Sequence, residues 1–126
     1  MPAPLGKTPT KKMPKIEVFG LPDSRQTRAA VRFFRERRIV VTFVDLGKRP
    51  IDAAELRAFL DRLGADGLLV DPPADGGIDR GALLARVRAD ASLLRLPLVR
   101  HGDEVTAGQD ETTWKAWLAR RSGGPR

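Results

Sequence analysis

The sequence predicts an α/β domain in which a β-α-β unit is followed by helices and then by a β-β-α unit. Two short runs rich in β-branched and apolar residues, 16–19 and 39–44, flank a segment with helical periodicity. Two strands joined by one helix form a parallel pair with a right-handed crossover. A hairpin pattern over 96–107 then precedes a final amphipathic helix.

The first helix is expected from about Ser24 to Arg37, directly after the strand at 16–19. Its core face is predicted from apolar and small residues at positions i, i+3, i+4 and i+7, which are Thr27, Ala30, Val31 and Phe34. The run 39–44 is continuously apolar and β-branched, which is typical of a strand buried on both faces.

The second helix has a clear start, because Asp52 and Glu55 form a capping box. Its apolar stripe is Leu56, Phe59, Leu60 and Leu63. We expect this helix to end at Gly64, and residues 65–77 to form a loop. Asp79 then caps a third helix.

The last third of the chain predicts a hairpin and a helix. A strand begins at or just after Pro97, residues 101–103 form a tight turn, and residues 104–107 form the returning strand. Asp110 caps the last helix, whose core stripe is Trp114, Trp117 and Leu118. The complete order is that of a thioredoxin-like fold with helices inserted before the hairpin.

Length and charge indicate one domain with charged ends. We expect a globular domain at 15–120 with a helical insertion at about 65–92, and disordered tails at 1–14 and 121–126. The net charge is +7, but residues 16–119 hold all 16 acidic residues and 16 of the 23 basic ones. The excess charge therefore lies in the tails, and nucleic-acid binding is expected to be weak and tail-mediated.

Several classes of protein are excluded by composition. The chain has no cysteine, so it can have no disulfide, thiolate metal site or cysteine nucleophile. With one histidine we expect no metal site. No apolar run approaches the roughly 20 residues that span a bilayer, and the N-terminal residues lack the apolar region of a secretory signal. We expect no membrane association and a cytoplasmic location.

Several short segments carry a family resemblance over about residues 15–119. They are Pro22 with Arg28, Phe43-Val44-Asp45-Leu46, Glu55-Leu56, Leu94-Arg95-Leu96-Pro97-Leu98-Val99, and Gly108-Gln109-Asp110-Glu111 with Trp114. Together they resemble the ArsC family, which contains glutaredoxin-like arsenate reductases and Spx-type transcription regulators. The resemblance implies a thioredoxin-like fold of ArsC/Spx type, with Pro97 in the cis-proline position where a peptide or thiol ligand can lie.

The departures from the family pattern concern the reactive residues. Ser24 and Thr27 stand where the family has Cys-x-x-Cys or Cys-x-x-Ser. Leu96 stands where the family has an anion-binding arginine, with Arg95 one residue away, and Gly108 falls near the place of another. Arsenate reduction needs a thiolate, so we assign no catalytic residue and expect a degenerate site at Ser24 and Thr27.

Two binding features remain on the first helix. Arg25, Arg28, Arg32 and Arg35 form one stripe, expected roughly opposite the apolar face, and called the arginine stripe below. It is either a docking strip for an acidic partner or phosphate backbone, or an ordinary solvated face. The helix start could hold an anion, or Asp23 or Ser24 could cap it. His101 is expected to be an exposed turn residue.

Three functions are compatible with these residues. The first is a non-catalytic protein-interaction module without a cofactor, for which the resemblance to Spx-type regulators makes RNA polymerase a possible partner. The second is an oxidoreductase or transferase of arsenate reductase type that uses an external thiol such as glutathione. The third is a nucleic-acid binder, which lacks interleaved exposed aromatic residues and ranks last.

Overall fold

The computed structural model describes residues 15–74 and 79–123. The elements, in order, are β2 (Ile16–Gly20), α1 (Arg25–Glu36), β3 (Val41–Asp45), α2 (Ala53–Leu68), α3 (Arg80–Ala89), the 3-10 helix η2 (Ala91–Leu93), β4 (Leu98–His101), β5 (Glu104–Ala107) and α4 (Glu111–Gly123). The expected N-terminal tail, 1–14, lies outside the described residues. Residues 121–123, which we expected in the C-terminal tail, belong to α4 instead.

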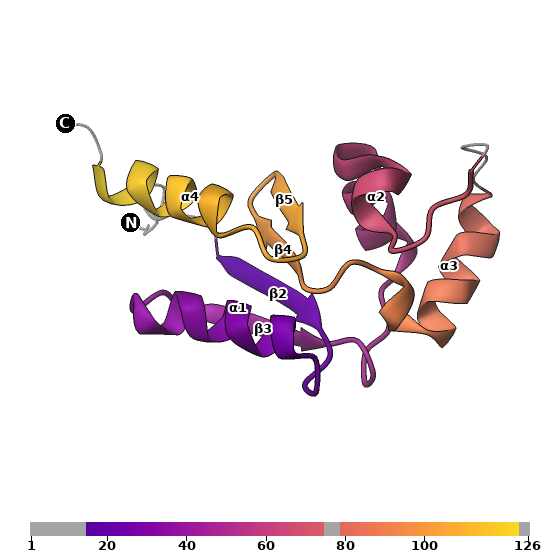
Figure 1. Ribbon diagram of the computed structural model, residues 1–126, viewed down its shortest axis with the longest axis horizontal. Helices are drawn as coiled ribbons and strands as arrows, with labels where there is room; N and C mark the ends of the chain where they lie inside the picture. The colour runs from indigo at the N-terminus through magenta and orange to yellow at the C-terminus, as the bar shows by residue number, and fades with distance from the viewer. Residues whose placement is uncertain (1–14, 75–78, 124–126) are drawn as a thin grey trace, which may run out of the picture.

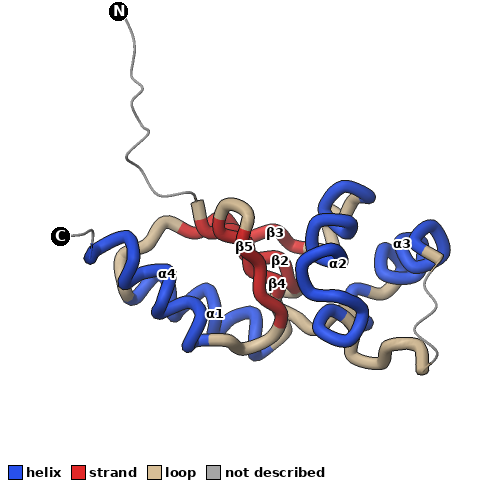
Figure 2. Tube along the Cα trace, turned by 90° about the horizontal axis from the view of Figure 1, so that it is seen from above, coloured by secondary structure: helices blue, strands red, loops and turns tan. Residues whose placement is uncertain are grey.

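The strands form one mixed sheet in the order β3-β2-β4-β5. β2 pairs in parallel with β3, and β4 pairs in antiparallel with both β2 and β5. Helices α1 and α4 lie together on one side of the sheet, and α2 lies on the other with α3 outside it (Figures 1 and 2). The order of elements and the parallel β2–β3 pair confirm the prediction. No described helix is long and apolar enough to cross a membrane.

The strand that is buried on both faces is β2, not β3. Along β2, Val18 packs with α1 and α4, and the next residue, Phe19, packs on the opposite face against Phe59 of α2. β3 lies at the edge of the sheet, and none of its residues is fully buried. The apolar run 39–44 was therefore misinterpreted: Val40, just before β3, is 81% exposed.

The core between the sheet and helices α1 and α4 is rich in aromatic side chains. Trp114 lies 5.3 Å from both Phe33 and Phe34, measured between ring centroids. Phe33 was not predicted on the core face of α1, whereas Val31, which was predicted there, is only partly buried. The reason is that α4 packs against α1 from the side, so the buried face of α1 is turned toward Phe33 and away from Val31.

Helix α2 begins as predicted and ends later. Asp52 and Glu55 form both hydrogen bonds of the capping box. At Gly64 the backbone takes φ 71° and ψ 170°, which breaks the helix there, but a further helical turn follows to Leu68. Gly64 is therefore a kink and not the end of the element, because Leu68 and Leu69 continue into the core beneath α3.

The predicted hairpin and last helix are confirmed, with one correction at the turn. Trp114 and Trp117 are buried on α4, and the Thr113 N–H is capped by Asp110. His101, expected to be exposed, is only 6% exposed and stacks on the Trp117 ring at 5.0 Å. It ends β4 on the α4 side of the sheet, so the tryptophan covers it.

Candidate functional site

The start of α1 is built by a short entry loop (residues 20–24) that follows β2. The Ser24 N–H donates to the Leu21 carbonyl at 3.0 Å, which closes a turn, and Ser24 then adopts the extended conformation of an N-cap. Its Oγ accepts a hydrogen bond from the Thr27 N–H at 3.2 Å. Of the two capping residues left open by the sequence, the structure therefore selects Ser24 over Asp23.

Thr27 fills the space beside the end of β2. Its side chain is 1% exposed, and its Oγ1 has no hydrogen-bond partner among the residues that the structure describes. A Cβ on Gly20 would collide with the Thr27 hydroxyl and would lie 2.7 Å from its Cγ2. Only glycine therefore fits where β2 passes the first turn of α1. Ser24 and Thr27, where we expected a degenerate site, thus serve as a helix cap and as a packed side chain.

Pro97 directly precedes the neighbouring strand, β4, at the same end of the sheet. Leu98 pairs with Phe19, so the register places Pro97 beside Gly20. The Leu96–Pro97 peptide bond is cis, which agrees with the position that the resemblance implies. Arg95 does not replace the missing arginine, because its Nε donates to the Asp66 carbonyl at 3.3 Å, at the far end of α2.

The four arginines of the stripe are all exposed. Arg28 donates to the Pro22 carbonyl at 3.1 Å, and none of the four forms an ion pair within the described residues. Elsewhere in the described chain, arginines do have carboxylate partners: Arg100 lies 2.7 Å from Glu17. The hydrogen bond to Glu17 raises the pKa of Arg100 above its ordinary value.

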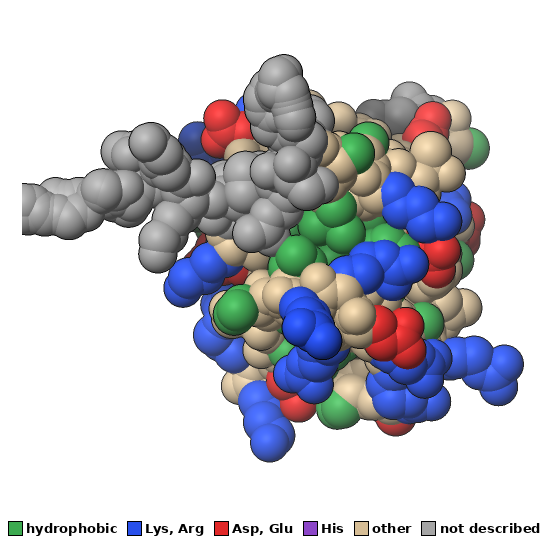
Figure 3. All heavy atoms as spheres, turned by 90° about the vertical axis from the view of Figure 1, so that its left-hand side faces the viewer, with side chains coloured by type: hydrophobic (Ala, Val, Ile, Leu, Met, Phe, Trp, Pro, Cys, Tyr) green, Lys and Arg blue, Asp and Glu red, His purple; other side chains and the backbone are tan. Residues whose placement is uncertain are grey.

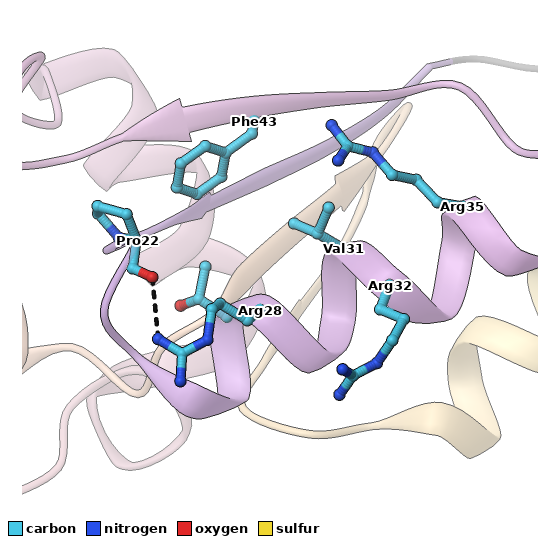
Figure 4. Close-up of a pocket in the computed structure, with 7 residues that line it drawn as sticks. Pro22, Arg28, Val31, Arg32, Arg35 and Phe43 are labelled. Atoms are coloured by element: carbon cyan, nitrogen blue, oxygen red, sulfur yellow. Dashed lines mark hydrogen bonds between the residues drawn. The ribbon is translucent and has the colours of Figure 1, made fainter.

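Three stripe arginines border a groove between α1 and β3, called the α1/β3 groove below. Its volume is about 430 Å³, and its lining residues are Pro22, Thr27, Arg28, Val31, Arg32, Arg35 and Phe43. Figure 4 shows Val31 and Phe43 in the middle, Arg28 beside Pro22 at one end, and Arg35 at the other. The stripe therefore does not lie simply opposite the apolar face, as we expected, but forms the rim of an apolar groove.

Sequence reasoning found the arginines and missed the groove. The signal that could have indicated it was Val31, an apolar residue between Arg28 and Arg32 on the same side of the helix. Phe43 gave no such signal, because only the edge position of β3 leaves its side chain partly uncovered. Among the described residues, no three His, Cys, Asp or Glu side chains are grouped to hold a metal ion.

Solved structures match this chain in fold, whereas comparisons of sequence find no match. No sequence-family profile and no curated protein sequence matches this chain. Among solved structures, the YFFB protein superposes with a TM-score of 0.70 at 18% identity, over 83% of this chain and 100% of its own. The fold is that of the ArsC-related proteins. Its thioredoxin-like α/β architecture of ArsC type is thereby confirmed.

Two further ArsC-related structures support the same assignment. An arsenate reductase from Vibrio cholerae gives a TM-score of 0.68 at 14% identity, over 85% of this chain and 100% of that one. An arsenate reductase (ArsC) related protein from Brucella melitensis gives 0.59 at 19% identity, over 82% and 94%. These two matches cover 94% and 100% of the solved chains, and the present chain has this fold without any cysteine.

Proposed function

We propose that this chain is a cysteine-free ArsC-family protein that acts by binding another protein and not by catalysis. The observation that carries the proposal is the hydrogen bond between the Thr27 N–H and the Ser24 Oγ at 3.2 Å. Ser24 stands where the arsenate reductases that this chain resembles have a nucleophilic cysteine, and here its side chain caps the helix. Thr27, at the other degenerate position, is packed against Gly20.

The chemistry of arsenate reduction supports this reading. A thiolate attacks arsenic, forms an As–S bond and expels a hydroxide, and a second thiol then attacks that sulfur, so that arsenic leaves with two more electrons. The hydroxyl of Ser24 can neither form this adduct nor supply electrons. The only histidine, His101, is stacked on Trp117 within the hairpin and α4, so it is not available to Ser24 as a base.

The contact surface that we propose is the arginine stripe together with the entry loop and Pro97. Arginine is enriched at the energetically dominant positions of protein interfaces, and the stripe has no carboxylate partner in the described residues. By the resemblance to Spx-type regulators, RNA polymerase is the first partner to test. A cytoplasmic location and weak, tail-mediated nucleic-acid binding belong to the same proposal.

Direct binding to purified RNA polymerase of the native cell tests this function. The full chain is immobilised and compared with the double variant Arg28→Glu/Arg32→Glu, and with Arg57→Glu/Arg86→Glu, which makes the same charge change on exposed positions of α2 and α3. We expect binding that survives nuclease and is lost only in the α1 variant. Equal binding by both variants, or none by the unchanged chain, would contradict the polymerase proposal.

A second candidate is an arsenate reductase type of enzyme that borrows an external thiol. The observation in its favour is that one of the matching structures is an arsenate reductase from Vibrio cholerae. In this reaction, one molecule of glutathione would form the As–S adduct and a second would release arsenite and oxidised glutathione. Arsenite formation from arsenate and glutathione, above that of a boiled control, would support this enzyme and contradict the non-catalytic proposal.

A further inference from the structure

The α1/β3 groove combines an apolar floor with a basic rim. Val31 and Phe43 form its floor, and the guanidinium groups of Arg28 and Arg35 lie near its two ends (Figure 4). A volume of about 430 Å³ is within the range of ~300–1,000 Å³ that is usual for ligand pockets. The groove lies along the side of α1, apart from Pro97, which belongs to β4's side of β2.

The positive charge of the arginine rim favours the binding of an acidic ligand. Around α1, arginines stand at 25, 28, 32, 35, 37 and 38, against acidic residues at 23 and 36. Arg37 is occupied locally, since it donates to the Phe33 carbonyl and covers the Phe33 ring. On the face at the ends of α1 and α4, basic side chains dominate over acidic ones around an apolar area (Figure 3).

The floor of the groove argues against a nucleic-acid backbone as the occupant. A phosphate chain would use the arginines but would form no hydrogen bond with the partly buried apolar side chains of Val31 and Phe43. An apolar side chain placed on them would bury surface worth about 25 cal/mol per Å². The occupant that uses every part of the groove therefore carries carboxylates on both sides of an apolar side chain.

The edge position of β3 favours an extended peptide. Within the described residues β3 pairs only with β2, and an edge strand presents backbone N–H and C=O groups to which another strand can add. The side chains of an added strand alternate between the two faces, so every second residue would point into the groove.

The spacing of the rim matches such a strand. Arg28 and Arg35 are seven residues apart in the helix, which is about 10 Å along its axis. In an extended peptide, residues i and i+4 lie about 13 Å apart with residue i+2 midway between them. Flexible arginine side chains can close the difference of about 3 Å, so two carboxylates can meet the ends while residue i+2 lies on the floor.

We propose that the α1/β3 groove binds an extended acidic peptide segment of a partner protein with the pattern acid–x–apolar–x–acid, added as a strand along β3. This inference rests on the proposed function, because it names the chemistry of the partner for part of the same surface. Arg28 and Arg35 bind the two carboxylates, Val31 and Phe43 receive the apolar side chain, and β3 supplies backbone hydrogen bonds.

A labelled peptide tests the proposal directly. The probe is fluorescein-Glu-Ser-Leu-Ser-Glu, titrated with the full chain at about 0.15 M salt and followed by fluorescence anisotropy. Its composition-matched control is fluorescein-Ser-Glu-Leu-Glu-Ser, in which the carboxylates point to the opposite face from leucine. We expect the first peptide to bind at least about fivefold more tightly, because only it places acids and leucine on one face.

Variants locate the peptide on the chain. Arg28→Glu/Arg35→Glu should weaken binding about tenfold or more. Arg57→Glu/Arg86→Glu, which makes the same charge change on exposed positions of α2 and α3, should change it less than about twofold. Slower hydrogen exchange of β3 amides in the presence of the peptide is expected, and this readout does not depend on any variant folding correctly.

Several results would overturn the inference. These are no binding up to about 1 mM peptide, equal binding of the two peptides, equal losses in the groove variant and Arg57→Glu/Arg86→Glu, or tighter binding of a single-stranded oligonucleotide of equal charge. If the peptide fails while a protein partner still depends on Arg28 and Arg32, the groove proposal is wrong and the proposed function stands. If the peptide binds by the expected rules while RNA polymerase does not bind, the groove proposal stands alone.

Discussion

Replacing Ser24 by cysteine tests whether the start of α1 still stabilises a negative charge. In the structure, the Ser24 side chain accepts a hydrogen bond from the Thr27 N–H at 3.2 Å. A thiolate at this position would accept the same bond and would lie at the positive end of the helix dipole. A hydrogen bond to a charged group contributes about 1.5–3 kcal/mol, and the dipole about 0.3–1 kcal/mol near an exposed surface.

Solvent exposure and the neighbouring Asp23 carboxylate reduce the sum, which leaves about 2 kcal/mol in favour of the thiolate. Because 1.4 kcal/mol is a factor of ten, the Ser24→Cys thiol should be roughly 30-fold more acidic than a free cysteine. Its pKa therefore lies below the ordinary value of about 8.5. The rate of alkylation by iodoacetamide as a function of pH measures it.

The matched control is Ser92→Cys. In the structure, Ser92 donates through both its backbone N–H and its hydroxyl to Asp90, and these hydrogen bonds lower the pKa of the Asp90 carboxyl. A thiolate beside that carboxylate is repelled, so its pKa should stay at or above the free value. If the thiols at positions 24 and 92 titrate alike, the start of α1 does not favour an anion and our reasoning about this site is refuted.

The stability of the Ser24→Cys variant should depend on pH. A thiol whose folded pKa is lowered contributes stability that is fully present above the unfolded pKa of about 8.5. The contribution is lost as the pH falls through the folded pKa. The melting temperature of Ser24→Cys, relative to the unchanged chain, should therefore be higher at alkaline pH than at neutral or acid pH.

Three further predictions concern packing and charge. Gly20→Ala should lower the free energy of unfolding by about 1–3 kcal/mol because of overpacking, as measured by urea unfolding. The double variant Gly20→Ala/Thr27→Ala should recover most of this loss, and additive effects would show that the two residues are not in contact. Trp114→Phe should cost about 1–3 kcal/mol in the same assay, because it leaves the Thr106 hydroxyl, 2.9 Å from the indole Nε1, buried without this donor; an unchanged unfolding midpoint would count against that bond. Deleting residues 1–14 and 122–126 should remove most binding to a fluorescent oligonucleotide, and the rest should fall steeply with salt; tight binding by the trimmed chain at about 0.15 M salt would show that the core itself binds nucleic acid.

Local signals in the sequence predicted the elements well, because caps and periodicity act within a few residues. The Asp52–Glu55 capping box, the Asp110 cap and the hairpin at 98–107 all need only neighbours along the chain, and all are present. The ends of helices were predicted less accurately than their starts. Gly64 is a typical end signal, yet packing of Leu68 adds another helical turn beyond it.

The errors arise where tertiary packing decides. The apolar run at 39–44 is equally compatible with a central strand and with an edge strand, since periodicity does not encode strand order. His101 lies in a turn sequence, and only the approach of α4 brings Trp117 over its ring. The α1/β3 groove needs Phe43 and Val31 from separate elements, so the pattern along the chain could indicate only its α1 side, through Val31.

The exposed edge of β3 has a consequence for how copies of this chain meet one another. An edge strand is a template for pairing with the same strand of a second molecule. Two copies that approached along β3 would bring Arg28, Arg32 and Arg35 of each chain near those of the other, and like charges across such a contact are destabilising. The arginine rim thus protects the edge from self-association, and raising the salt concentration, which screens this repulsion, weakens the protection.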